Sequence, residues 1–132
     1  MAKLSRRKFL KQTLVGTATG LLSPTLLAQS PTPSEVEGPF YPITPQKDKD
    51  FDLTRVKGKS GRAKGEIIHV QGQVLDQNLS PLQDVTIDLW QANSFGKYHH
   101  PHDNSSAPID ENFQSWAIIK SGHQGKFNFI TV

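Results

Sequence analysis

The chain of 132 residues contains no cysteine, so no disulfide can brace it and its own packed core must hold the fold together. It has no internal repeat, and no helical pattern after residue 28. Its apolar run near the N-terminus, residues 13–27, is shorter than the roughly 20 residues that cross a membrane comfortably. These absences favour one small exported β domain over a helical, repetitive or membrane-spanning protein.

Acidic residues are missing from the N-terminal 28 residues, where five of the 15 basic residues lie. The remainder holds ten basic and twelve acidic residues, so its charge is close to −2 and the pI near 9.3 comes from the leader. A mixed patch at residues 47–64 has seven basic residues interleaved with aspartates. We interpret the patch as a solvated loop and expect no nucleic-acid partner.

The N-terminus carries an export signal. Ser5 to Lys11 fills every position of a twin-arginine motif through Arg6 and Arg7, a mildly apolar stretch follows, and Ala28 offers a small residue for cleavage. We therefore predict a twin-arginine signal peptide at residues 1–28, recognition by the twin-arginine export machinery, and a periplasmic or extracellular location. This route exports folded proteins, which suits a chain that acquires its metal in the cytoplasm.

Two further segments follow the leader. Residues 29–65 are rich in proline and charge and predict an extended or looped segment. Period-two alternation predicts strands in residues 66–74, 85–90, 116–119 and 127–131, with turns at 76–81 and 121–125 and a long irregular segment at 94–112. The fold class is therefore an all-β antiparallel sandwich in residues 66–132.

The stretch from Trp90 to His100 places Tyr98 after a glycine turn and beside two histidines. Tyrosine keeps its proton to about pH 10, but a metal displaces that proton, because ligands bind best deprotonated. A phenolate is a hard oxygen donor that suits a hard ion such as ferric iron. Tyr98 is thus a candidate metal ligand.

In these motifs the chain resembles the intradiol ring-cleavage dioxygenases of the protocatechuate and catechol type. The match covers nearly all of residues 35–132. Its matching segments are Glu37-Gly38-Pro39-Phe40-Tyr41-Pro42, residues 52–56 and 61–65, residues 72–76 with Pro81-Leu82, Trp90-Gln91-Ala92-Asn93 with Gly96-Lys97-Tyr98, then Asp110, Asn112 and Phe113, and Gly125 to Thr131. The segment ending at Tyr98 is the most specific. The chain departs from the family pattern at Ser115 and at Ser121-Gly122, neither of which is a ligand position.

The resemblance implies a non-haem Fe(III) enzyme that opens the ring of a small aromatic diol with O2, and that can be an oligomer. Tyr98 matches the tyrosinate that stays bound to iron, and Pro39 and Tyr41 match positions near the substrate. In the family, a second tyrosine and a His-x-His pair follow the strand that ends here. We therefore expect a truncated, incomplete sandwich with Tyr98 beside an open cleft, and we expect residues 1–132 alone not to hold catalytic iron.

Two alternatives stay open. The Gly-x-Val-x-Asp hairpin and the Gly-x-Phe-x-Phe strand also occur in non-catalytic transthyretin-like or regulatory sandwich modules. His99, His100 and His102 with Asp103 could form a separate metal site, although their spacing matches no common structural-zinc pattern; solvated loop histidines are the simpler interpretation. We interpret His69 and His123 as structural, and Trp90 and Trp116 as core or cleft-wall residues.

Overall fold

The computed structural model describes residues 30–132, so Arg6, Arg7 and the rest of the predicted signal peptide lie outside the described residues. Regular structure is almost entirely strand. The four strands are β1 (Ile68–Gln73), β2 (Thr86–Trp90), β3 (Trp116–Lys120) and β4 (Lys126–Thr131), with one 3-10 turn, η1 (His123–Gly125), before β4. The all-β prediction is confirmed, and each predicted strand is found within two residues of its expected bounds.

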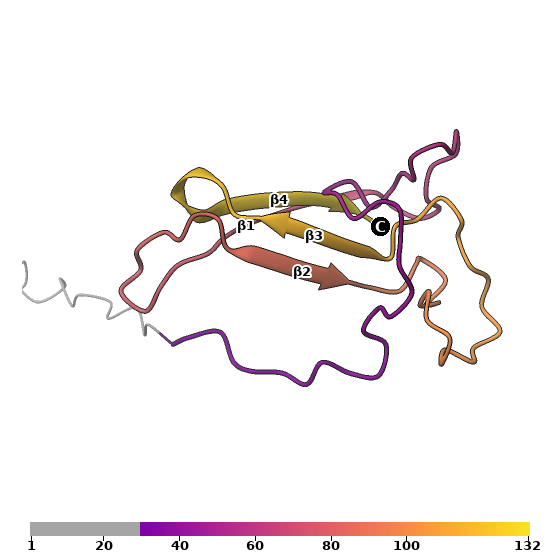
Figure 1. The fold of residues 1–132 in the computed structure, drawn as a ribbon, viewed down its shortest axis with the longest axis horizontal. Helices are drawn as coiled ribbons and strands as arrows, with labels where there is room; N and C mark the ends of the chain where they lie inside the picture. Colours follow the sequence, from indigo (N-terminus) through magenta and orange to yellow (C-terminus); the bar gives the residue numbers. More distant parts are fainter. Residues whose placement is uncertain (1–29) are drawn as a thin grey trace, which may run out of the picture.

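The strands pair as two antiparallel sheets, β1 with β4 and β2 with β3. In the first sheet Ile68 faces Thr131 and Gln73 faces Lys126. In the second, Thr86 faces Lys120 and Trp90 faces Trp116. The four strands lie roughly along one axis, with turns at one end and long loops at the other (Figure 1). We call these the turn end and the loop end.

One small core is shared by both sheets. Ala117 of β3 is buried together with Leu53, Ala63 and Phe113 from the loops, and side chains of β2 and β4 pack against them, namely Leu89 and Phe129. The inner faces of the two sheets therefore meet, as in a sandwich, but the strands themselves contribute few fully buried residues. Among residues 30–132, no helix is long and apolar enough to cross a membrane.

The backbone of residues 49–53 joins the two sheets along one side. The Ile118 N–H donates to the Lys49 carbonyl at 2.9 Å, and the Ile130 N–H donates to the Phe51 carbonyl at 2.8 Å. The Leu53 N–H in turn donates to the Ile130 carbonyl at 2.9 Å. This part of the predicted loop segment thus acts as a connector between β3 and β4.

The alternation predicted for β1 holds only in part. Val70 and Gly72 are half-buried as predicted, but Ile68 is 45% exposed and Ile67 is the half-buried residue instead. Gly72 is needed because a Cβ atom there would lie 2.3 Å from the ring of Phe127, its cross-strand partner.

Candidate active site

A tight turn follows β2 and sets the position of Tyr98. The Asn93 side chain is buried, and its Oδ1 accepts the N–H groups of Phe95 at 2.9 Å and Lys97 at 3.0 Å. Its Nδ2 donates to the Pro108 carbonyl at 2.9 Å. Gly96 has a φ of 78°, which a side chain would strain. Asn93 and Gly96 therefore form the turn, and the Asn93 side chain is used for hydrogen bonds within the turn rather than for a ligand.

Asp103 fixes the residues that follow. Its carboxylate accepts the Tyr98 N–H at 2.7 Å and the Ser105 N–H at 2.9 Å, and the Lys97 ammonium lies 3.5 Å away. Hydrogen bonds from the backbone and side chain of Ser105, with that from Tyr98, hold the pKa of the Asp103 carboxyl well below its usual range. Asp103 is therefore ionised at neutral pH and closes residues 97–105 into a loop around itself.

The Tyr98 ring packs against the N-terminal segment. Its centroid lies 4.9 Å from that of Phe40, and the Phe40 centroid lies 5.7 Å from the His100 ring. Within residues 30–132, no hydrogen bond reaches the Tyr98 hydroxyl. The structure thus brings together Tyr98, Phe40 and His100. The sequence motif at residues 37–42 includes Phe40 but does not predict this contact. Pro39, next to Phe40, is exposed.

The prediction that the loop histidines are all solvated is wrong for His100. His99 and His102 are exposed, but His100 is only 8% exposed, and its Nδ1 accepts the His102 N–H at 3.1 Å. The cause is contact with two other rings: the tilted Phe40 ring lies 5.7 Å from the His100 ring, and the His102 ring meets it edge-on at 5.2 Å. Sequence spacing alone gave no sign of this contact.

The Tyr41 side chain lies against residues of β2 and β3 rather than against Tyr98. Its hydroxyl donates to Asp88 Oδ2 at 2.7 Å, and its ring meets Trp90 and Trp116 edge-on at 5.0 and 6.0 Å. Trp116 Nε1 donates to the other Asp88 oxygen at 2.7 Å. Asp88 raises the pKa of Tyr41, first through the hydrogen bond, so this phenol keeps its proton. The two tryptophans are half-buried walls of this cluster rather than core.

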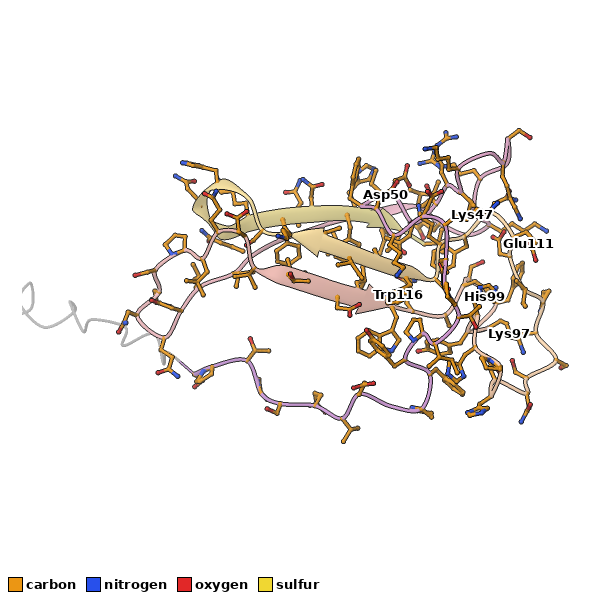
Figure 2. The ribbon with its side chains drawn as sticks, in the orientation of Figure 1. Lys47, Asp50, Lys97, His99, Glu111 and Trp116 are labelled. Carbon is orange, nitrogen blue, oxygen red and sulfur yellow. The ribbon has the colours of Figure 1, made fainter. Side chains whose placement is uncertain are left out.

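A pocket of about 450 Å³ lies at the loop end, between residues 45–59 and residues 93–115. We call it the loop pocket. Lys97 and His99 line it, but Tyr98 between them does not. Figure 2 shows Lys47, Lys97, His99 and Glu111 gathered at this end, beyond the strands. The loop pocket is therefore lined by the residues on either side of Tyr98 and not by Tyr98 itself.

No group of three or more His, Cys, Asp or Glu side chains converges anywhere in residues 30–132. Tyr98 has the chemistry of one ferric donor, but a ferric site needs several. His99, His100, His102 and Asp103 do not form such a group either.

Sequence analysis missed the residues that order this end. Gln114 is 3% exposed, and its Nε2 donates to the carbonyl oxygens of Asp52 at 2.8 Å and Arg55 at 2.7 Å. Asp88 and Asp103, which hold Tyr41 and Tyr98, were also missed as supporting residues. The available signal was Gln114 itself, an uncharged polar residue beside an apolar strand. This signal is weak because the partners of Gln114 lie about 60 residues away in the sequence.

Comparison with known proteins gives a consistent result. A family model described as "Dioxygenase" matches residues 36–132. The protocatechuate 3,4-dioxygenase beta chain of Burkholderia cepacia is 32% identical over 112 residues, which cover 72% of this chain and 48% of that protein. A candidate dioxygenase of Rickettsia typhi is 31% identical over 90 residues, covering 61% and 42%.

Among solved structures, a 3-chlorocatechol 1,2-dioxygenase from Rhodococcus opacus has a TM-score of 0.57 at 24% identity. The superposition covers 76% of this chain and 38% of that one, and supports the fold. The chain spans about half the length of the curated relatives that it matches.

Proposed function

The chain belongs to the intradiol ring-cleavage dioxygenase family, and on that premise we propose that it supplies the Tyr98 part of an active site that opens catechol-type rings with dioxygen. The match includes the segment from Trp90 to Tyr98 as well as the Glu37–Pro42 motif. A transthyretin-like module needs neither segment. The family match therefore favours the dioxygenase interpretation over the non-catalytic one.

The observation that carries this proposal is the way in which Tyr98 is held. Its backbone is fixed by Asp103, its ring by Phe40, and its hydroxyl is left without a partner inside the described residues. A fixed ring with a free hydroxyl is what a metal-ligating tyrosine needs, because loose ligands lose both affinity and orientation. Tyr41 is the opposite case, since Asp88 already occupies its hydroxyl.

The family's ferric iron, when bound, supplies the Lewis acid that holds the diol as a dianion and activates it toward dioxygen. We propose that this chain contributes Tyr98 as one donor and that the other donors lie outside residues 30–132. Phe40 then covers part of the Tyr98 ring and His100 packs against Phe40, whereas the Tyr41 and Trp90 rings form a separate contact. Pro39, exposed beside Phe40, remains a candidate substrate neighbour.

The test is the colour of the iron-loaded protein, expressed from its complete gene. A ferric tyrosinate absorbs visible light, so Tyr98→Phe should weaken the band and lower iron affinity about tenfold or more, as loss of a donor predicts. Tyr41→Phe is the matched control and should keep the band, because its hydroxyl binds Asp88. A Tyr98→Phe protein with full colour, iron and turnover would reduce Tyr98 to a packed aromatic.

A companion experiment uses residues 29–132 alone. With no three-donor group in residues 30–132, we expect less than stoichiometric ferric iron and no oxygen uptake with catechol or protocatechuate. Stoichiometric iron with ring cleavage would show that these residues are sufficient.

We also propose export by the twin-arginine route, on the strength of Arg6 and Arg7. Replacing both with lysine keeps the charge but removes the recognised pair, so the precursor should accumulate in the cytoplasm. The measurement is cell fractionation with immunodetection, and replacing Lys8 and Lys11 with arginine is the control that should not block export. Unchanged export of the Arg6→Lys/Arg7→Lys precursor would refute the assignment.

A further inference from the structure

Lys97 takes part in two structures at the loop end, one through its backbone and the other through its side chain. Its N–H donates to Asn93 Oδ1 at 3.0 Å, and its carbonyl oxygen accepts the Asn93 N–H at 2.9 Å. Its ammonium donates to the carbonyl oxygens of Asp103 at 2.7 Å and Ser105 at 2.8 Å. The residue before Tyr98 thus joins the turn after β2 to the residues that close the next loop.

The donors of the Lys97 ammonium are already used within the chain, although Lys97 lines the loop pocket. An ammonium has three N–H donors; two bind the carbonyl oxygens, and Asp103 Oδ1 lies 3.5 Å away for the third. The Lys97 side chain is only 12% exposed, and that of Asp103 only 6%. Such a lysine holds the backbone in place rather than attracting a ligand to the pocket.

Asp103 connects Lys97 to the backbone of Tyr98. One carboxylate oxygen, Oδ2, accepts the Tyr98 N–H at 2.7 Å, while Oδ1 faces the Lys97 ammonium. We propose that Lys97 is a positioning residue for Tyr98: it holds Asp103 in place, and the Asp103 carboxylate fixes the backbone from which the Tyr98 ring extends. The inference rests on the proposed function, in which the Tyr98 hydroxyl is an iron donor. Lys97 acts through Asp103 and is not a catalytic residue.

The Asp103 carboxylate has a single cationic partner. Among residues 30–132, its only salt bridge is the one with Lys97. Without that ammonium, a nearly buried carboxylate would be left with no counter-charge, which is costly. The carboxylate then gains free energy by turning toward water, and the Tyr98 N–H loses its acceptor. The hold on the Tyr98 backbone therefore depends on the Lys97 ammonium.

Packing alone does not fix the direction of the Tyr98 ring. The ring lies against Phe40 with an angle of 32° between the planes and 4.9 Å between the centroids. A tilted contact between two rings is attractive, but it includes no hydrogen bond that sets a direction. Since a binding site needs its donors within about 0.5 Å of their working positions, the backbone anchor supplies the precision that the ring contact lacks.

The first test needs no metal. In the 132-residue chain, Lys97→Met keeps a similar side-chain length but removes all three donors, and amide hydrogen exchange followed by NMR reports each backbone hydrogen bond. The Tyr98 and Ser105 amides, which both bind Asp103, should exchange at least about tenfold faster, the factor that one lost hydrogen bond to a charged group represents. The Asn93 amide, which binds the carbonyl oxygen of residue 97, should exchange as in the parent chain.

Lys59→Met is the matched control. Lys59 also lines the loop pocket and also lies close to a carboxylate, at 2.7 Å from Glu111 Oε2, so its variant should leave the Tyr98 amide unchanged. Unchanged exchange of the Tyr98 amide in Lys97→Met would overturn the positioning role. Equal acceleration of all amides, those of β1 and β4 included, would also overturn it, because Lys97 would then stabilise the fold as a whole.

A second variant answers the question if Lys97→Met does not fold. Lys97→Met/Asp103→Asn removes the uncompensated carboxylate together with the lysine, and it is compared with Asp103→Asn alone. The double variant still lacks the ammonium that binds the carbonyl oxygens of Asp103 and Ser105, so its Tyr98 amide should exchange faster than that of the single variant. Equal exchange in the two variants would show that Lys97 does not position Tyr98.

The second test uses the iron-loaded protein expressed from its complete gene. Loss of a partner that supports a metal ligand lowers metal affinity about ten- to hundredfold, so Lys97→Met should reduce iron affinity by that factor and move the visible band, whereas Lys59→Met should do neither. Unchanged affinity and band in Lys97→Met, with both reduced in Tyr98→Phe, would overturn the positioning role and leave the proposed function intact. If Tyr98→Phe keeps full iron, the proposed function fails and the role of Lys97 in iron binding fails with it, whereas exchange of the metal-free Tyr98 amide still decides whether Lys97 holds this loop.

Discussion

The two ends of the strands are ordered by different kinds of interaction. At the turn end a local turn is prominent, in which Asp76 Oδ1 accepts the N–H groups of Asn78 and Ser80 at 2.8 Å each, and the buried Ser121 bonds Leu82 and Val85 across the chain. At the loop end more of the side-chain hydrogen bonds are long-range, and they join Gln114 to residues 50–55 and Asn93 to Pro108. The candidate site lies at the second end, and the stability of its loops therefore depends on side-chain hydrogen bonds across the chain.

The small apolar core explains why the loop end needs these bonds. Only four hydrophobic residues are buried in the described part of the chain, whereas eight polar or charged ones are. Most of these buried polar residues belong to the loop end, namely Thr54, Asn93, His100, Asp110, Gln114 and Ser115. Since buried polar groups are costly when unpaired, the loop end should be more sensitive to single polar substitutions than the turn end.

The largest effect is expected for Gln114→Ala. The change removes one buried amide and leaves the carbonyl oxygens of Asp52 and Arg55 without that donor, at a cost of about 2–3 kcal/mol. Gln73→Ala is the matched change at the turn end, where the exposed amide donates to Gln124, and should cost within about 0.5 kcal/mol. Urea unfolding measures both, and equal losses would remove the distinction between the two ends.

The same difference explains what the sequence could predict. Strands 68–73 and 126–131 follow from alternation between neighbours, and the turn at Asp76–Pro81 from local turn chemistry. These signals are contained within a few residues. The contact of Tyr41 with Asp88, 47 residues away, has no local signal, so the residues that hold the candidate site could not be predicted even where Tyr98 itself could.

A second effect concerns acid. The pKa of Asp103 is lowered in the folded chain, so its stabilisation is fully present above the unfolded pKa near 3.9 and is lost as pH falls below it. Asp103→Asn should therefore lower the urea midpoint at pH 7, and the gap to the parent chain should narrow at pH 3. The side chain is only 6% exposed, so solvent competes little for its hydrogen bonds.

Glu111→Gln provides the control for Asp103. Lys59 also lowers the pKa of Glu111, but this side chain is 74% exposed, and exposed ion pairs contribute little. We expect a smaller difference in urea midpoint between Glu111→Gln and the parent chain at pH 7, and this difference should also narrow as the pH falls. A gap for Asp103→Asn that widens from pH 7 to pH 3 would contradict the sign of the Asp103 linkage.

The smallest effect is expected at the turn end and has the opposite sign. Leu79 adopts a φ of 63° and is 45% exposed, so it carries left-handed strain with little burial in return. Leu79→Asn relieves part of that strain and should stabilise the chain by about 0.5 kcal/mol, because asparagine tolerates this conformation. Leu82→Asn is the control: Leu82 is 39% exposed and is not among the described residues with positive φ, so the same exchange should bring no gain. If thermal unfolding shows equal shifts for both variants, the turn end is held by leucine contacts rather than by local backbone geometry, and the contrast between the two ends is weaker than their hydrogen bonds suggest.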